Sequence, residues 1–474
     1  MKGEPRMSHD TPSVTAEFSG VDLGDKRRNR RLIDLVGKLE ERPAESFPKA
    51  LGTEARTEAM YRFLENKDVH WSTIFDGHVD HTIQRSVAAQ RILCVHDTST
   101  MAFPGEVQRT GLFPSTKGKH AYLGHTALAI SADGARRPLG LLGYIPVVRP
   151  AEGEEIPLGT SYDNESHRWI DLVDHVEGTV PDEVDVVHVM DREGDAYQLL
   201  SVLTQYNASF VIRQSQNRRI LDPGGLKYLK DHLPTAKRVI QRAVKISKRG
   251  GLRPPQDRRI HPDRLERHAK LELRCVSDVC IRRPDRSTDE LSSITVNLVH
   301  VVEPDPPKGE PAIDWLLLTS MPVSTSEQVE EIVDFYRARW IIEEFFKALK
   351  TGCSYTKRQL ESLDTLLVAF AMLAPIAWKL LALRWMSRNE PNAPASVLFT
   401  ADQLVLLRRL DGKRKKGLGE HPTTHEAMMA VARLGGFLSQ NKLPGWQILG
   451  RGLTHFLTVY EGWKVAMSTT QDGV

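Results

Sequence analysis

Two aspartates that follow apolar, β-like runs limit most strongly what this chain can fold into. Asp97 follows the run Ile92–Val95, and Asp191 follows the run Val184–Met190. In an open α/β sheet, functional side chains gather at the carboxyl ends of the strands. The sequence therefore predicts an α/β core with an acidic side chain at each of two strand ends.

A helix predicted over residues 336–350 adds one acid surrounded by cations. At about 100° per residue, five of its polar side chains fall within an arc of roughly 80° on one face. These side chains are Tyr336, Arg339, Glu343, Lys347 and Lys350. Two aspartates and one glutamate suit a pair of hard divalent cations, and the surrounding cations suit a polyanionic substrate. This combination indicates phosphodiester chemistry.

Length and charge set the wider frame. A chain of 474 residues predicts two to four domains. The net charge is only +3, but residues 213–270 hold seventeen Lys or Arg against five Asp or Glu. The first 15 residues are polar and lack an apolar signal core, so a cytoplasmic location is expected. The uncharged stretch 365–378 is too short to span a bilayer and contains Pro375, so it predicts a buried helix.

The four cysteines are scattered along the chain. Cys275 and Cys280 have four residues between them and no second Cys or Cys/His pair nearby. A structural zinc site needs four ligands, so no zinc is expected at this pair. Reduced cytoplasmic thiols are the expectation.

Residues 18–70 predict a small helical module. Asp25 is a suitable N-cap, and five cations follow it in the first two turns, where they oppose the helix dipole. They are Lys26, Arg27, Arg28, Arg30 and Arg31. Docking of a phosphate there would explain them, because backbone N–H groups and arginines would converge on one anion. The alternative is a solvated charged face. A second helix carries Arg62, which is expected to face outward.

The rest of the chain divides by composition. Strands are predicted at 125–131, 139–146 and 210–213. The basic, Pro- and Gly-punctuated region 214–310 favours a β-rich insertion before the sheet resumes at Trp315. After residue 365 the chain is helical, broken by the basic loop Lys413–Lys416, for which a solvated loop is favoured over a DNA contact.

These features together resemble a known family. The pattern Tyr-x2-Arg-x3-Glu-x6-Lys is met by Tyr336, Arg339, Glu343 and Lys350, inside a longer matching string that ends at Gly352. Further matches are spread over nearly the whole chain, at 23–32, 61–63, 97–98, 191–193, 210–213, 315–319 and 432–437. On these residues the chain resembles the insertion-sequence-four family of bacterial cut-and-paste DDE transposases.

The resemblance implies an architecture and an activity. It implies a helical DNA-binding domain (1–70), an RNase H-like catalytic domain (71–365, with the β-rich insertion at about 214–310) and a helical dimerisation domain (366–474). Such a protein acts as a homodimer on double-stranded DNA, and each active site cuts the transposon end held mainly by the other subunit. Cleavage passes through a hairpin on the transposon end, and the freed 3′-OH then joins target DNA. No membrane is involved.

The acidic residues receive roles in metal binding. Two Mg²⁺ ions per active site, roughly 4 Å apart, are expected, and Mn²⁺ is expected to support activity as well. Asp97 is predicted to bridge both ions, while Asp191 and Glu343 each complete one. His96 precedes the bridging residue, so its side chain should point to the opposite face of the strand and serve a structural role.

The cationic and aromatic residues receive roles in DNA binding. Tyr336, Arg339 and Lys350 suit phosphate positioning, and Lys347 is a weaker candidate on the same face. The alternative for this face is a set of ion pairs with Glu343 and Glu344.

Other DNA contacts follow from the resemblance. A strand tryptophan is usually a core residue, but the resemblance implies that Trp315 stacks on an extruded base. Arg213 and, with less support, Arg192 match arginines near the distorted strand. The candidates for binding the transposon end are Arg27, Arg28, Arg31 and Arg62.

Three functions remain open. An active transposase is the leading one. A non-catalytic DNA-binding regulator or domesticated relative is the second, although carboxylates clustered without a metal repel one another. A plain metal-dependent nuclease without strand transfer is the third.

Overall fold

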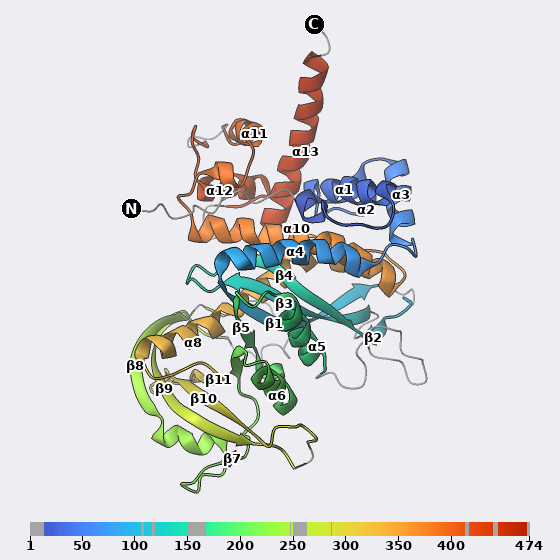
Figure 1. The fold of residues 1–474 in the computed structure, drawn as a ribbon. Helices are drawn as coiled ribbons and strands as arrows, with labels where there is room; N and C mark the ends of the chain where they lie inside the picture. Colours follow the sequence, from blue (N-terminus) through green and yellow to red (C-terminus); the bar gives the residue numbers. More distant parts are fainter. Residues whose placement is uncertain are drawn as a thin grey trace, which may run out of the picture. The chain divides into compact units, whose positions relative to one another are not determined.

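The chain folds into two compact units (Figure 1). A computed structural model describes residues 14–105, 109–115, 119–148, 167–246, 248–249, 263–285, 287–412, 417–438 and 444–471. Unit 1 contains residues 1–89, 98–165 and 341–474, and unit 2 contains residues 90–97 and 166–340. The predicted loop Lys413–Lys416 lies outside the described residues, as do most of the first 15 residues.

Unit 2 is built on a mixed sheet. Its hydrogen-bonded order is β1-β5-β6-β11-β10-β9-β7, and β8 pairs with β9. The strands are β1 (Arg91–Pro104), β5 (Asp185–Met190), β6 (Ser209–Arg213), β7 (Ile220–Leu221), β8 (Lys237–Ile246), β9 (Arg267–Arg282), β10 (Ser293–Val302) and β11 (Asp314–Thr319). Strands β1, β5 and β6 run parallel, and the remaining pairs are antiparallel. The strands predicted around 184–190, 210–213 and 315–319 are confirmed.

Helices cover both faces of this sheet. Helices α5 (His167–Thr179) and α6 (Tyr197–Gln205) supply Trp169 and Leu200 to a buried cluster with Phe210 and Leu316 of the sheet. Helix α8 (Ser326–Ala338) contacts β5, β6 and β10, yet none of the described members of that cluster comes from it. Because side chains alternate between the faces of a strand, α8 covers the opposite face.

The basic region is β-rich, as predicted, but its strands do not form a sheet of their own. Strand β10 pairs with β11 along six residues, from Asn297 to Val302, and β9 pairs with β10 on its other side. Apolar residues of β9 and β10, such as Val279 and Ile294, lie in the same cluster as the residues of α5 and α6. Continuous pairing and a shared core therefore join this region to the sheet of unit 2.

Unit 1 contains the N-terminal and C-terminal helices and a smaller group of strands. Strand β3 pairs with β2, β4 and β1. The second half of β1, from residue 98 on, belongs to unit 1. The elements before α9 are η1 (Val14–Phe18), α1 (Lys26–Glu41), α2 (Phe47–Leu51), α3 (Glu54–Leu64), α4 (Trp71–Ala89), β2 (Phe113–Ser115), β3 (Lys119–Ser131) and β4 (Pro138–Val147). The later elements are α9 (Trp340–Lys347, which begins one residue before the unit), η4 (Ala348–Gly352), η5 (Tyr355–Lys357), α10 (Leu363–Asn389), η6 (Ala395–Val397), α11 (Ala401–Asp411), α12 (Thr424–Leu434) and α13 (Trp446–Gln471).

Strand β1 is longer than the sequence predicts. It continues through Asp97 to Pro104, so this aspartate lies within the strand and not at its end. The segment after Asp97 contains β-branched threonines, which favour an extended backbone. It also buries Met101 and Phe103 at alternate positions in unit 1, so strand pairing is favoured beyond the apolar run.

Helix α10 is the central helix of unit 1. It contacts α4, β4 and α12, and 89 % of its apolar 18-residue segment is buried within the protein. By length and composition alone this helix could cross a membrane. Because most of its residues are buried, it is a core helix, as predicted for 365–378.

Helix α13 begins against α12 and then extends past the other helices of unit 1 (Figure 1). Close packing at its start requires glycine. A Cβ on Gly452 would lie 2.0 Å from the carbonyl oxygen of Val431 in α12. The backbones of the two helices therefore approach more closely than any side chain would allow.

Candidate active site and DNA-binding residues

Asp97 and Asp191 lie on neighbouring parallel strands of unit 2. The last paired positions of β1 and β5 are Val95 and Val189, and each aspartate comes two residues later. Side chains two residues apart share a face, so both carboxylates point to the face that carries Val95 and Val189. This is the face of α8, because Arg91, also on that face, lies over the ring of Phe335. Neighbouring strands are about 4.8 Å apart, so the register brings the two acids close together.

A cation already sits beside Asp97. Arg339, the C-cap residue of α8, donates from Nη1 to Oδ2 of Asp97 at 3.1 Å. Both side chains are 15 % exposed, so the pair is largely withdrawn from water. These two residues are 242 positions apart in the chain, and the sequence alone assigns them no contact.

Asp191 begins a short turn. Its backbone is extended, and its carboxylate accepts a hydrogen bond from the N–H of Glu193 at 2.9 Å. This N-capping contact fixes the direction of the side chain. Arg192, the next residue, is exposed.

The predicted helix 336–350 is not one regular helix. Helix α8 ends at Ala338, α9 begins at Trp340, and a π-helical turn follows from Ala348 to Gly352. The single polar face expected for an ideal helix is therefore interrupted. Glu343 lies in α9, one turn after Arg339, and is half-buried. The two aspartates belong to unit 2 and Glu343 belongs to unit 1, so the structure does not bring the three acids together within one unit.

Lys350 is held against the second half of β1. Its Nζ donates to Oγ of Ser99 at 2.7 Å and to the carbonyl oxygen of Thr100 at 2.8 Å. The π-helical turn that contains Lys350 widens the helix, which changes the direction of its side chains from that of a regular helix. Lys350 is therefore fixed next to the residues that follow Asp97.

Lys347 takes the alternative role that the sequence left open. It forms an ion pair with Glu344 at 3.1 Å and is 47 % exposed. Glu344 also pairs with Arg384 at 2.9 Å and accepts a hydrogen bond from the indole N–H of Trp446. Burial raises the pKa of Glu344, but Arg384, Lys347 and Trp446 outweigh burial, so the pKa is lowered. Glu344 is thus an anchor that joins α9 to α10 and α13.

Three residues predicted to contact DNA lie together in unit 2. The rings of Trp315 and Tyr336 pack edge to face, with centroids 5.5 Å apart. The guanidinium of Arg213 lies over the Trp315 ring, 5.7 Å from its centroid. Trp315 is half-buried at the start of β11, so it is neither a core residue nor a free surface residue. The group joins β6, β11 and α8.

A buried ion pair that the sequence did not indicate supports the segment after Arg213. Asp195 accepts hydrogen bonds from the backbone N–H groups of Ser215 and Gln216 and from the guanidinium of Arg218. The side chains of Asp195 and Arg218 are 0 % and 6 % exposed. A buried carboxylate with this many donors holds the segment in one conformation. An Asp four residues after Asp191 carries no distinctive pattern in the sequence.

The N-terminal arginines form an exposed set with one exception. Asp25 is the N-cap of α1, as predicted, and accepts from the N–H of Arg27 at 2.7 Å. Arg27, Arg31 and Arg62 are exposed, whereas Arg28 is half-buried, donates to the carbonyl of Leu23 and pairs with Asp68. Arg28 thus has a structural partner that the sequence did not predict.

Trp340 also has no role assigned from the sequence. It directly follows Arg339, and it is 56 % exposed.

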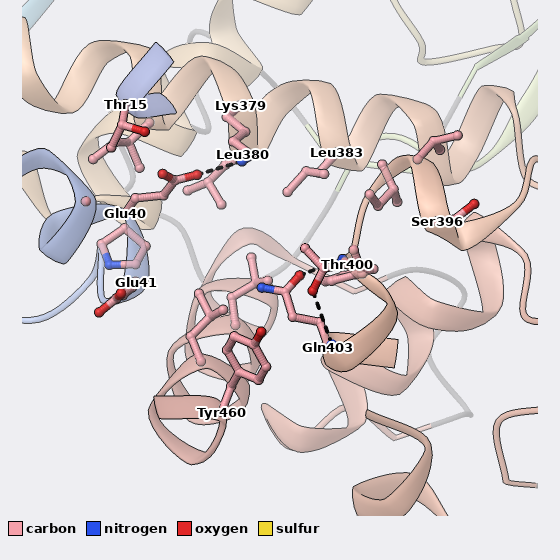
Figure 2. A pocket seen from close by; sticks show the side chains of 18 of the residues that line it. Thr15, Glu40, Glu41, Lys379, Leu380, Leu383, Ser396, Thr400, Gln403 and Tyr460 are labelled. Carbon is pink, nitrogen blue, oxygen red and sulfur yellow. Dashed lines mark hydrogen bonds and ion pairs between the residues drawn. The ribbon is translucent and has the colours of Figure 1, made fainter. Parts of the chain in front are cut away.

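A cavity in unit 1 is separate from these residues. It has a volume of about 530 Å³ and lies between the end of α1 and helices α10, α11 and α13 (Figure 2). Polar contacts on its wall include the Lys379–Glu40 ion pair at 2.6 Å and the capping of α11 by Thr400 and Gln403. These groups satisfy one another, and none of the predicted site residues lines the cavity.

Comparisons with known proteins agree with the chemistry of these residues. Residues 11–69 match the family model "Transposase DNA-binding", and this match contains all four of the predicted end-binding arginines. Residues 156–378 match the "Transposase DDE domain", which includes Asp191, Trp315 and Glu343, whereas Asp97 precedes the matched region.

One solved structure that the chain matches is the "Cryo-EM structure of piggyBac transposase synaptic complex with hairpin DNA (SNHP)". The sequences are 12 % identical, the match covers 77 % of this chain and 67 % of that chain, and the TM-score is 0.36. At this level of similarity the match carries no information on the function of this chain. The two family models show that this chain is a DNA transposase, with a DNA-binding domain matched over residues 11–69 and a DDE catalytic domain matched over residues 156–378.

Proposed function

We propose that this transposase cuts and pastes DNA in the manner of the insertion-sequence-four family. It binds transposon ends, cuts them through a hairpin intermediate and joins the freed 3′-OH to target DNA. The observation that carries the proposal is the pairing of Asp97 with Arg339, because it joins two of the predicted site residues over 242 positions of sequence. The three domains predicted from the sequence (1–70, 71–365 and 366–474) and the cytoplasmic location remain part of the proposal.

The acidic residues fit hard divalent ions. DDE chemistry uses divalent metal, and Asp97 and Asp191 offer carboxylate oxygens from neighbouring strands on one face of the sheet. The ion pair with Arg339 indicates that positive charge is favourable beside Asp97. In this proposal Asp97, Asp191 and Glu343 would hold two Mg²⁺ ions, and Mn²⁺ would serve as a substitute. When bound, such a pair of ions activates the attacking oxygen and stabilises the leaving oxygen in an in-line displacement.

The cationic residues orient the DNA backbone. Arg339 neutralises Asp97 in the protein alone and, once the carboxylate has other partners, can turn its guanidinium to a phosphate oxygen. Lys350, held by Ser99 and Thr100, presents an ammonium beside the strand segment that follows Asp97. Tyr336 supports both the Arg339 turn and the Trp315 ring. Lys347 keeps only a minor role, because it pairs with Glu344.

The Trp315 group suits an unpaired base. A hairpin strains the terminal base pairs, and an extruded base is stabilised by stacking on an aromatic ring. Trp315 is half-buried and packs edge to face with Tyr336, which restricts the orientation of its ring. Arg213 over the same ring adds a positive charge next to the place where the distorted strand would pass.

The terminal parts suit end binding and dimerisation. Arg27, Arg31 and Arg62 are exposed within the matched DNA-binding region, and we assign them to the phosphates of the transposon end. Arg28 is a weaker candidate for phosphate binding, because its guanidinium forms an ion pair with Asp68. Helix α13 extends past its neighbours, with Trp463 half-buried and Met467 50 % exposed, and we assign it to a homodimer contact.

The test uses the DNA that flanks the gene. A plasmid carrying both flanks is incubated with Mg²⁺ and either the wild type, Glu343→Ala or the control Glu327→Ala, an exposed carboxylate at the start of α8. We expect hairpin-ended excised fragments with the wild type and the control only, and equal gel shifts with all three proteins.

Each contrary outcome has a separate meaning. Cleavage by Glu343→Ala would refute the metal assignment. Gel shifts without cleavage by any of the three would favour a non-catalytic regulator, and cleavage without joined products would favour a plain nuclease.

A further inference from the structure

A second group of potential metal ligands lies on the other face of β1. Sγ of Cys94, Nε2 of His96 and Nδ1 of His188 all lie within 4.8 Å of one another. The sulfur is 3.3 Å from Nε2 of His96, and that nitrogen is 2.8 Å from Nδ1 of His188. All three side chains are fully buried. Two nitrogen donors and one sulfur donor therefore converge on a single point inside unit 2.

The strand pattern explains this convergence. Cys94 and His96 are two residues apart in β1, so they share a face, opposite to that of Asp97. In the parallel pairing of β1 with β5, Cys94 is the register partner of His188. Helix α5 covers this face, since the Trp169 ring lies 6.4 Å from the His96 ring. The predicted orientation of His96, away from Asp97, is confirmed.

The histidine of β5 is oriented as a metal ligand would be. Nε2 of His188 lies 2.7 Å from Oε1 of Glu177 in α5, so it carries the proton that this carboxylate accepts. Nδ1 then directs its lone pair at the group. A carboxylate behind a histidine is the usual outer partner of a metal-bound imidazole, where it fixes the tautomer and the ring orientation.

Hydrogen bonds alone account for only part of the arrangement. Nε2–H of His96 can donate to Nδ1 of His188, which completes a chain to Glu177. In that chain Nε2 of His96 is a donor, so the nearby thiol of Cys94 cannot donate to it. A metal ion would use all three atoms. It would also balance the charge of the buried group, because a divalent ion offsets one thiolate and the carboxylate of Glu177.

We propose that Cys94, His96 and His188 bind one zinc ion, with Glu177 as the outer partner of His188. Nitrogen and sulfur donors select zinc over the hard Mg²⁺ that suits the aspartates. In a tetrahedral zinc site two nitrogens lie about 3.3 Å apart, and a nitrogen and a sulfur about 3.5 Å apart. The present distances are 2.8 and 3.3 Å, so binding needs only a small outward movement of the side chains. Three protein ligands leave the fourth position for water.

The zinc ion would fasten β1 to β5 immediately before the two aspartates. His96 adjoins Asp97, and His188 lies three residues before Asp191. A bond through the metal between these strands would fix the spacing of the two carboxylates. This consequence rests on the proposed catalytic function, whereas zinc binding itself does not.

The experiment measures metal content and affinity in the full chain. The purified protein is stripped with a chelator, dialysed against excess Mg²⁺ and loaded with Zn²⁺, or with Co²⁺ as a spectroscopic probe. We expect one zinc per chain and, with cobalt, a thiolate charge-transfer band. Cys94→Ala should lose both, while Cys353→Ala, a change at another fully buried cysteine, should keep both. The proposal would be overturned if the wild type binds no zinc after loading, or if Cys94→Ala binds as much zinc as the wild type.

Two more variants separate the possible causes of failure. Glu177→Gln changes a partly exposed residue outside the ligand set, and it should weaken zinc binding by about 10- to 100-fold without loss of folding. An unchanged affinity in Glu177→Gln would refute the site even if Cys94→Ala fails to fold. Asp97→Asn should keep its zinc, so the zinc result stands or falls independently of the Glu343→Ala cleavage result.

Discussion

Replacement of Glu17 should destabilise unit 1 in a way that depends on pH. Glu17 lies in η1, within the matched DNA-binding region, and is fully buried. One of its oxygens is 2.6 Å from Nδ1 of His78, and its two oxygens accept from Arg85 at 2.8 and 3.1 Å. Nε2 of His78 accepts the N–H of Leu141, and Arg85 donates to the carbonyl oxygen of Leu139. The network thus fastens η1 to α4 and β4.

The size of the effect follows from the pKa of Glu17. Burial raises this pKa, but hydrogen bonds and charge interactions with His78 and Arg85 outweigh burial and lower it from 4.5 to about 2. At about 1.4 kcal/mol per pH unit, this difference corresponds to about 3 kcal/mol. Loss of one partner from a buried ion pair costs a similar amount, about 3–5 kcal/mol. We therefore expect Glu17→Gln to lower the free energy of unfolding by about 3 kcal/mol at pH 7.

The pH dependence has a definite sign. The pKa of Glu17 is lower in the folded protein, so its contribution is complete above pH 4.5 and is lost as the pH falls toward 2. Burial also lowers the pKa of His78 from 6.5, so this residue destabilises the fold as the pH falls below that value. At pH 3 the free energy of unfolding of the wild type should exceed that of Glu17→Gln by only about 1 kcal/mol.

The assay is urea unfolding of the full chain at pH 7, 5 and 3, followed by tryptophan fluorescence. Trp378 lies 4.2 Å from the Arg85 guanidinium and reports on this region. The control is Glu41→Gln, which removes a partly exposed ion pair with Lys38 and should change stability by less than about 1 kcal/mol. A loss below 1 kcal/mol at pH 7 in Glu17→Gln, or a difference that stays constant from pH 7 to 3, would refute this reasoning.

Three further changes test other parts of the molecule. Trp315→Ala should keep DNA binding and the first nick but yield fewer hairpins on denaturing gels, because the extruded base loses its stacking partner; equal hairpin yields would contradict the assignment. Gly452→Ala should lower the thermal midpoint and weaken self-association in sedimentation, because its Cβ would lie 2.0 Å from the Val431 carbonyl oxygen; unchanged values would show that α12 and α13 can separate freely. Tyr122→Phe removes a buried hydroxyl that contacts Tyr355 at 2.6 Å and Tyr144 at 3.0 Å, so we expect a loss of about 1–3 kcal/mol in urea unfolding; a neutral effect would mean that the other two hydroxyls satisfy each other.

Local patterns in the sequence predict several strands and one helix cap correctly. The apolar run before Asp191 forms β5, and the runs predicted as strands at 125–131 and 139–146 lie in β3 and β4. Asp25 caps α1 as predicted. These features depend on residues within a few positions of one another, so composition and spacing are sufficient to identify them.

Contacts between distant residues could not be predicted. The partner of Asp97 is Arg339, and the ring beside Trp315 is that of Tyr336, but no local pattern links these positions. The break between α8 and α9 and the π-helical turn at Ala348 depend on packing in the folded chain. The sequence predicts too short a β1 because polar residues interrupt the apolar run, although Met101 and Phe103 continue to bury one face of the strand.

The two metal-binding groups that we propose on β1 offer different ligands, nitrogen and sulfur for zinc and carboxylate oxygen for Mg²⁺. They are separated only because successive side chains of the strand point to opposite faces. Cys94 and His96 point to the face of α5, and Asp97 points to the face of α8. A register shift of one residue would exchange these faces and place imidazole and thiol where the carboxylate should be. An apolar strand resists such a shift only through packing, whereas a zinc ion bonded to both β1 and β5 would forbid it. Removal of zinc should therefore lower DNA cleavage by more than it lowers DNA binding, because the N-terminal arginines lie in unit 1 and do not depend on this register.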